Sequence, residues 1–250
     1  MGRWQWAGAS CRGTSHAKAG TRRQDAFSCA LVVDGSTLSV SVSDGAGSAK
    51  RGGTGAALLC RTLDRLIGDH FSRTSELPDD AAIESWIDIA RDRISDVAKR
   101  SALTARDFAC TLILTISNGS DTVVAHIGDG AAAVRLTDNS WEVMSWPAQG
   151  EYASTTFFVT DEVLKLRTSR LSFPINGLAC FTDGIERLAL NFGRGVAHDP
   201  FFQGIIRPVD ALDSPGRDAR LSKALQIYLD APAVNERTDD DKTLVLAALR

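Results

Sequence analysis

Residues 40–55 carry the sequence Val40-Ser41-Val42-Ser43-Asp44-Gly45-Ala46-Gly47-Ser48-Ala49-Lys50-Arg51-Gly52-Gly53-Thr54-Gly55. The apolar, β-branched run at its start predicts a strand, and that strand ends at a single aspartate, Asp44. A glycine follows at once, and a glycine-rich turn then leads into a segment that predicts a helix. An aspartate at the mouth of a strand, beside pliant backbone, can offer a carboxylate and a nearby carbonyl to one hard cation.

The strand before Asp44 is one half of a predicted hairpin. Residues 24–33 predict the other strand, and Asp34-Gly35 between the two is a hairpin dipeptide. Asn118-Gly119 marks a second hairpin, and apolar stripes predict long helices over 54–69 and 79–103. We therefore predict one α+β domain over residues 1–250, in which helices cover antiparallel sheets built from hairpins.

The second half of the chain predicts shorter elements. Strands are expected over 155–160 and 163–168, and a buried strand over 177–182 runs into Asp183-Gly184. Residues 192–216 are expected to be loop-rich, and a last helix is expected over 217–229. A final strand over 243–249 follows the acidic run Asp239-Asp240-Asp241.

Bulk composition narrows the class of protein. A formal net charge of −3 argues against a binder of duplex nucleic acid, which usually carries a basic face. No apolar run approaches the ~20 residues that span a bilayer, and the N-terminus lacks the apolar core of a signal peptide. The five cysteines are widely spaced and form no Cys-x-x-Cys pair, so we expect buried free thiols in a reducing cytoplasm.

Five aspartates stand where a predicted strand meets a turn: Asp25, Asp44, Asp129, Asp183 and Asp240. Carboxylates at one rim of a sheet can share a site only if cations neutralise them, because like charges raise one another's pKa. Oxygen ligands select hard ions such as Mg²⁺ and Mn²⁺, and two such ions about 4 Å apart activate a water for phosphate-ester hydrolysis. The plainer alternative is that Asp-Gly is only a turn dipeptide.

The ordered set of motifs resembles that of the metal-dependent type 2C (PPM) protein serine/threonine phosphatases. The resemblance extends from Asp25 to Val245, and each motif is short, but their order and spacing are specific. The matching motifs are Gln24-Asp25-Ala26, Asp44-Gly45-Ala46-Gly47, Cys110-Thr111, Gly128-Asp129-Gly130, Thr182-Asp183-Gly184 and Asp240-Asp241-Lys242-Thr243.

The resemblance implies a fold and a mechanism. The fold is an αββα sandwich of two antiparallel sheets flanked by helices. Two cations, Mn²⁺ or Mg²⁺, are implied, with Asp44 bridging them, the Gly45 carbonyl on one, and Asp183 with Asp240 on the second. Asp25 would act through metal-bound water, and Asp129 with Asp183 would form a weaker third site. A hydroxide bridging the two cations would attack phosphoserine or phosphothreonine, with no phosphoenzyme.

The chain departs from the family pattern at the groups that handle the substrate. Ala46 stands where animal members have a histidine proposed as general acid, and Asp241 replaces an asparagine. Gly20 stands where the family has its phosphate-binding arginine. Arg22 and Arg23 lie nearby but out of register. Either is a substitute phosphate clamp, or both belong to a solvated basic loop.

Two histidines bear on the same question. His16 is either an acid or phosphate donor for the reaction, or a capping or surface residue. His126, in the middle of a predicted strand, is expected to be a satisfied core residue. Residues 145–156 correspond to the family's variable flap, where Trp146 or Tyr152 either contacts substrate or packs against the sheet.

A bacterial subgroup of the family is also similar in the order of four stretches: Gly13-Thr14-Ser15-His16, Gln24-Asp25-Ala26, Gly150-Glu151-Tyr152 and Asp240-Asp241. Members of that subgroup often accompany a serine/threonine kinase and a von Willebrand A-type protein. The leading hypothesis is an active phosphoprotein phosphatase. Two alternatives are a catalytically weak relative that binds phosphoprotein as a regulatory module, and a two-metal phosphoesterase acting on small molecules.

Overall fold

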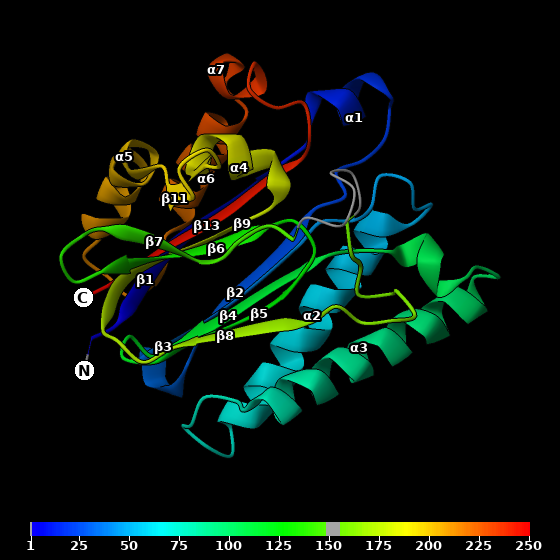
Figure 1. Cartoon of the computed structure of the whole chain (residues 1–250), viewed down its shortest axis with the longest axis horizontal. Helices are drawn as coiled ribbons and strands as arrows, with labels where there is room; N and C mark the ends of the chain where they lie inside the picture. The colour runs from blue at the N-terminus through cyan, green and yellow to red at the C-terminus, as the bar shows by residue number, and fades with distance from the viewer. Residues whose placement is uncertain (1, 149–155) are drawn as a thin grey trace.

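Two antiparallel sheets lie face to face in the computed structural model, which describes residues 2–148 and 156–250 (Figure 1). Helices α2 and α3 cover one outer face, and α4, α5 and α6 lie over the other (Figure 1). The α+β sandwich expected from the sequence is thus confirmed, with its layers in the order helix, sheet, sheet, helix.

The first sheet has five strands in the order β2-β3-β4-β5-β8. Hairpins at Asp34-Gly35 and Asn118-Gly119 join β2 to β3 and β4 to β5, as predicted. In the β2–β3 pair Ala26 lies opposite Ser43, so Asp25 and Asp44 lie at the same end of the sheet. The strand bounds are β2 (Ala26–Val32), β3 (Thr37–Ser43), β4 (Leu112–Ser117), β5 (Thr122–Ile127) and β8 (Arg167–Leu171).

The second sheet has six strands in the order β12-β1-β13-β9-β6-β7. Its strands pair antiparallel except for β1 and β12, which pair parallel. Leu244 lies opposite Phe181, so the residues after β9 meet the residues before β13. The bounds are β12 (Gly216–Arg217), β1 (Trp4–Cys11), β13 (Lys242–Leu249), β9 (Ile175–Phe181), β6 (Ala131–Leu136) and β7 (Trp141–Ser145).

Apolar packing fills the gap between the sheets and both outer faces. Val40 and Val42 of the first sheet pack with Cys180 and Val245 of the second in the central layer. The predicted stripes face the first sheet from α2 (Gly52–Phe71) and α3 (Asp80–Arg100). The second sheet packs against α4 (Asp183–Ala189), α5 (Asp199–Asp210) and α6 (Ala219–Leu229).

Several predicted elements are wrong. Residues 156–160 form no strand, and most of 163–168 precedes β8; Thr155 lies outside the described residues. The apolar run 108–116 predicts a strand, but β4 begins only at Leu112, after a 3₁₀ turn at Ala105–Phe108. The region 192–216, expected to be loop-rich, contains α5, whose Pro200 stands in the first turn, where the helix needs no N–H from it.

Short elements complete the chain. Residues 13–23, expected as a loop, contain α1 (Thr14–Lys18), and α7 (Pro232–Asn235) precedes the acidic run. The small pair β10 (Leu190–Asn191) and β11 (Val196–Ala197) links α4 to α5. All five cysteines are free thiols. Within residues 2–148 and 156–250, helices that are both long and apolar enough to cross a bilayer are absent.

Candidate metal centre

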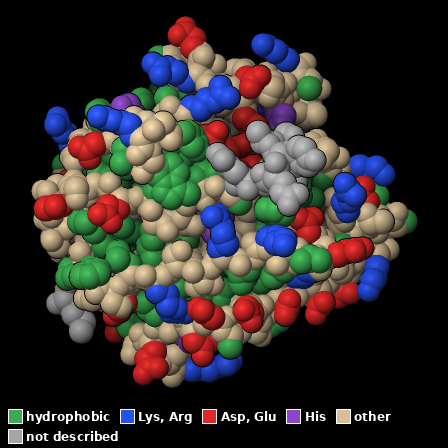
Figure 2. All heavy atoms as spheres, viewed as in Figure 1, with side chains coloured by type: hydrophobic (Ala, Val, Ile, Leu, Met, Phe, Trp, Pro, Cys, Tyr) green, Lys and Arg blue, Asp and Glu red, His purple; other side chains and the backbone are tan. Residues whose placement is uncertain are grey.

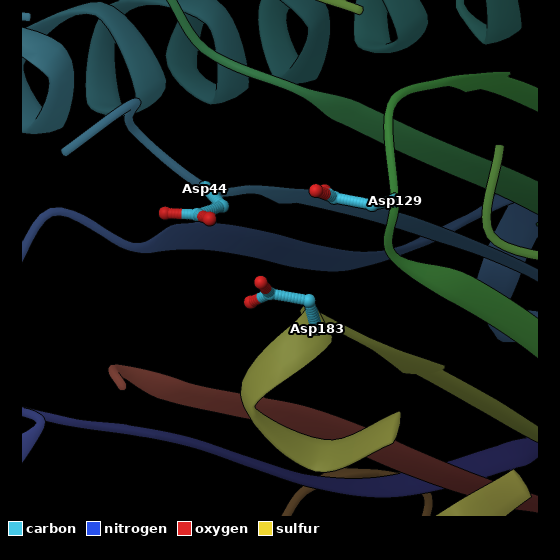
Figure 3. Close-up of side chains that lie close together, drawn as sticks. All are labelled: Asp44, Asp129 and Asp183. Carbon is cyan, nitrogen blue, oxygen red and sulfur yellow. The ribbon is translucent and has the colours of Figure 1, made fainter. Parts of the chain in front are cut away.

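Three aspartates from three different strand ends converge between the two sheets. Asp44 follows β3, Asp129 lies between β5 and β6, and Asp183 begins α4 directly after β9. Each offers a carboxylate oxygen, and these oxygens all lie within 4.8 Å of one another. Figure 3 shows the three side chains approaching from opposite sides of one space. The prediction that strand-end acids meet is confirmed for these three residues.

The backbone of Asp44 is anchored to the neighbouring strand. Its N–H donates to Thr111 Oγ1 at 3.0 Å, and its carbonyl accepts the Thr111 N–H at 2.8 Å. Gly45 packs so closely on Gly52 that a Cβ on Gly45 would overlap the Gly52 backbone. The Asp-Gly pair is therefore wedged between β4 and the start of α2, which fixes where the Asp44 carboxylate points.

Asp25 is buried next to Asp44 and is held by two threonines of the other sheet. Its Oδ2 accepts hydrogen bonds from Thr182 Oγ1 at 2.8 Å and from Thr243 Oγ1 at 2.7 Å. Its Oδ1 has no hydrogen-bond partner within the described chain, although it is buried. One oxygen is thus tied to the second sheet and the other is left for a different ligand.

Asp129 and Asp183 are held by tight turns. Gly128 has φ +110°, a conformation that favours glycine, and a Cβ on it would overlap the Thr111 side chain, so this glycine lets the backbone before Asp129 pack on Thr111. A Cβ on Gly184 would overlap the Asp241 carbonyl oxygen, so this glycine lets Asp183 approach the acidic run. In both aspartates Oδ1 is buried and lacks a hydrogen-bond partner among residues 2–148 and 156–250.

Burial and crowding raise the pKa values of this group. Burial raises the pKa of Asp25 to about 6 against hydrogen bonds that lower it. Burial, then the charges of Asp129 and Asp240, raise the pKa of Asp183 to about 8. The pKa of Asp44 lies well above its usual value through burial and the charges of Asp25 and Asp183. Without cations the cluster resists being fully charged.

These residues fit a divalent cation. The donors are carboxylate oxygens, which suit hard ions such as Mg²⁺ and Mn²⁺. Three of them are buried oxygens with no other partner in the described residues, and a bound cation would favour their charged forms. Asp240 contributes its charge to the raised pKa of Asp183, while its Oδ1 accepts the Asp241 N–H at 2.7 Å.

The predicted phosphate-binding and acid residues lie on the segment before β2. Arg22 is exposed, whereas Arg23 donates from Nε to the Asp25 carbonyl at 3.2 Å and from Nη1 to the Ser10 carbonyl at 2.9 Å. His16 Nδ1 lies 2.9 Å from Asp241 Oδ1. The basic segment therefore adjoins the acidic run, and within residues 2–148 and 156–250 the Nη2 of Arg23 has no hydrogen-bond partner.

His126 is buried in the core, as predicted, but it is not a fully satisfied residue, because its Nε2 has no hydrogen-bond partner among residues 2–148 and 156–250. Its Nδ1 lies 2.7 Å from Ser145 Oγ and 2.8 Å from Arg167 Nη2. An arginine can only donate, so Nδ1 accepts and the proton sits on Nε2. Burial, then the Arg167 charge, lowers the His126 pKa to about 3. Trp146 packs with Phe192, and Tyr152 lies outside the described residues.

The supporting threonines were missed from the sequence. Thr111, Thr182 and Thr243 all stand inside the motifs that contain or follow the acids, so a signal existed in their positions. Their role could not be recognised because their partners are distant in the sequence. Thr182 and Thr243, for example, both donate hydrogen bonds to Asp25.

An open space adjoins the centre on the α4 side. A cavity of about 350 Å³ is lined by Asp183 and Asp240, with Glu186, Arg187 and Arg237 in its wall. Figure 2 shows acidic side chains gathered in a hollow on this face of the molecule. A ligand that reaches the three carboxylates thus has room beside them.

Comparison with known proteins gives one consistent family. A sequence model described as protein phosphatase 2C matches residues 12–226. The chain is 38% identical over 251 residues to serine/threonine-protein phosphatase 3 of Escherichia coli (strain K12), covering 98% of both. The fold is similar to that of PppA, a regulatory component of T6SS in Pseudomonas aeruginosa, with TM-score 0.65, 18% identity, and 99% and 98% of the two chains covered. It is also similar to the catalytic domain of the serine threonine protein phosphatase PstP in complex with 2 manganese ions, with TM-score 0.64, 16% identity, and 100% and 99% covered.

Proposed function

The chain belongs to the protein phosphatase 2C family and is a metal-dependent serine/threonine-protein phosphatase, and from that premise we propose which residues carry the reaction. Asp25, Asp44, the Gly45 carbonyl, Asp183 and Asp240 hold two divalent cations, and Asp129 with Asp183 forms a weaker third site. The observation that carries this assignment is the meeting of carboxylate oxygens of Asp44, Asp129 and Asp183 within 4.8 Å. Asp129 and Asp183, like Asp25, each have a buried Oδ1 with no hydrogen-bond partner among the described residues.

Mn²⁺ or Mg²⁺, when bound, supplies an activated water as nucleophile and neutralises the charge of the phosphoryl group. The protein fixes the ligands in advance. Thr182 and Thr243 hold one oxygen of Asp25, and Thr111 holds the backbone of Asp44. Such preorganisation matters because a misplaced ligand lowers both cation affinity and rate.

The residues that contact the substrate phosphate and protonate the leaving group lie, in this proposal, on the segment between β1 and β2. We assign the phosphate contact to Arg22, with Arg23 Nη2, which has no partner in the described part of the chain, as a further donor, because a guanidinium pairs bidentately with phosphate. Ala46 has no proton to give, so we assign protonation of the leaving alkoxide to His16. The proximity of His16 to Asp241 supports this placement.

The substrates are phosphoproteins, and we further propose a cognate serine/threonine kinase as their source and a von Willebrand A-type protein as an accompanying partner. The order of the motifs from Gly13 to Asp241 supports these two partners. We also propose that residues 1–250 form a single phosphatase domain in the cytoplasm. The family match over residues 12–226 and the free thiols support these two proposals.

The test is hydrolysis of a phosphoserine peptide and of p-nitrophenyl phosphate with Mn²⁺ or with EDTA. Native protein should turn over both substrates only with the cation, and Asp44→Asn should lose at least about 100-fold in kcat/KM. The control Asp199→Asn changes an exposed acid at the start of α5 and should keep native rates. EDTA-insensitive turnover, or a fully active Asp44→Asn, would refute the metal assignment; turnover of metabolites but not the peptide would favour the small-molecule alternative.

A further inference from the structure

Asp241 is a buried carboxylate beside the metal centre that the assignments above leave without a role. Its side chain is only 1% exposed. Its Oδ1 accepts the Gly13 N–H at 2.6 Å, and its Oδ2 accepts the Gln24 N–H. His16 Nδ1 lies 2.9 Å from the same Oδ1. The Asp241 carboxylate therefore contacts one group before α1, one within it and one after it. All three are remote from Asp241 in the sequence.

The segment that contains His16 is seated on the acidic run by further contacts. Ser15 donates to the Asp239 carbonyl from its N–H at 2.9 Å and from its Oγ at 2.7 Å. A Cβ on Gly13 would overlap the Asp240 backbone, so the two segments pack without a side chain between them. Helix α1 has five residues and is too short to be stable alone. Its position is set by the acidic run.

The contact between His16 and Asp241 fixes which ring nitrogen is available. The ring N–H does not point directly at the oxygen, so this contact is a close electrostatic pair rather than an aligned hydrogen bond. A carboxylate beside one imidazole nitrogen favours a proton there and sets the ring orientation. Nδ1 is buried against Asp241, and the His16 side chain is 18% exposed. Nε2 is the nitrogen left for a substrate.

We propose that Asp241 is a positioning residue that holds His16 with Nε2 toward the leaving group, and that holds the Gln24–Asp25 turn beside it. The proposal rests on the role proposed above for His16. When a water-derived oxygen bonds to phosphorus, the phosphorus–oxygen bond to the seryl or threonyl oxygen breaks and its electron pair stays on that oxygen. The seryl or threonyl oxygen then takes the proton that the His16 ring, protonated at both nitrogens, carries on Nε2. Solvent then returns a proton to Nε2.

At position 241 an aspartate suits the neighbouring His16 better than an asparagine would. A carboxylate accepts at both oxygens, so it satisfies the N–H groups of Gly13 and Gln24 and still faces the ring. An asparagine has one accepting oxygen, and its NH₂ would face either an N–H donor or the protonated ring. The chemistry of Asp241 thus fits a position that faces two backbone N–H donors and His16.

The test compares leaving groups, because a general acid matters for a poor leaving group and little for a good one. The variants are His16→Ala, Asp241→Asn and the double variant, assayed at saturating Mn²⁺ with p-nitrophenyl phosphate and a phosphoserine peptide. Each single variant should lose on the order of 100-fold in kcat on the peptide and much less on p-nitrophenyl phosphate. The double variant should match His16→Ala, because Asp241 acts through His16.

Asp239→Asn is the matched control, because it removes one charge from the same run while the Asp239 carbonyl that holds Ser15 remains. It should leave the ratio of the two substrates unchanged. Equal losses on both substrates in Asp241→Asn, or additive losses in the double variant, would overturn the positioning role. If Asp241→Asn does not fold, His16→Ala and His16→Gln decide the matter, and an unchanged substrate ratio in both would overturn it. A native protein without EDTA-sensitive turnover would instead refute the metal centre.

Discussion

Replacing Asp183 by asparagine should stabilise the metal-free protein and reduce its stabilisation by Mn²⁺. Burial and neighbouring charges raise the pKa of Asp183 to about 8, from 3.8. The folded state therefore holds a proton that the unfolded state has lost, and stability declines as pH rises from 3.8 to about 8. At about 1.36 kcal/mol per pH unit, the free energy of unfolding lost by pH 7 is about 4 kcal/mol at most. It is an upper bound because the neighbouring acids titrate together with Asp183.

The measurement is urea unfolding at pH 7 with EDTA and with saturating Mn²⁺. Asp183→Asn should unfold at higher urea than native protein in EDTA, by up to that amount. Native protein should gain about 2.7 kcal/mol from each cation site whose Kd the Mn²⁺ concentration exceeds 100-fold, and Asp183→Asn should lack the increment of the cation that Asp183 holds.

Asp199→Asn is the matched control, because Asp199 begins α5 as Asp183 begins α4. It removes the same interaction with a helix N-terminus, which is about 0.3–1 kcal/mol, without touching the cluster. If Asp183→Asn were less stable than this control in EDTA, the Asp183 carboxylate would stabilise the metal-free fold. Repulsion among the clustered carboxylates would then not be the dominant effect. A full Mn²⁺ increment in Asp183→Asn would refute its role as a ligand.

Gly184→Ala should lose about 1–3 kcal/mol and most Mn²⁺-dependent activity, because its Cβ would overlap the Asp241 carbonyl. Gly204→Ala, with open space at that position, should gain up to about 1 kcal/mol in urea unfolding; equal behaviour of the two variants would contradict the close packing at Gly184. His126→Asn tests the buried network with Arg167. Because burial lowers the His126 pKa from 6.5 to about 3, its contribution is complete above pH 6.5 and is lost as pH falls toward 3. The difference in unfolding free energy between native and variant should shrink from pH 7 to pH 4, and a constant difference would contradict a neutral buried imidazole.

The strands and hairpins of the first sheet could be predicted because their signals are local. Asp34-Gly35 and Asn118-Gly119 specify tight turns whatever lies around them, and the pairings they predict are present. Helix α5 was missed although its apolar residues have helical spacing. Pro200 and Pro208 are breakers in general, but one stands in the first turn and the other near the end of the helix.

The acids of the metal centre could be predicted from motifs, whereas the groups that hold them could not. Three strand ends meet as expected at Asp44, Asp129 and Asp183. The pairing of Thr182 and Thr243 on Asp25 depends on the register between β9 and β13 and on the packing of one sheet on the other. That register joins residues far apart in the chain, and no local pattern states it.

The position of β13 in its sheet affects the order in which the chain folds. This strand lies between β1 and β9, and it pairs along its whole length with β1 from the opposite part of the chain. Pairings between such distant segments form slowly, because a long loop must close before any contact stabilises it. During synthesis the second sheet stays open until residues 242–249 leave the ribosome, and Asp240 and Thr243 arrive with them. A chain that lacks residues 242–249 therefore lacks the strand that joins β1 to β9, and it lacks Thr243, which holds one oxygen of Asp25.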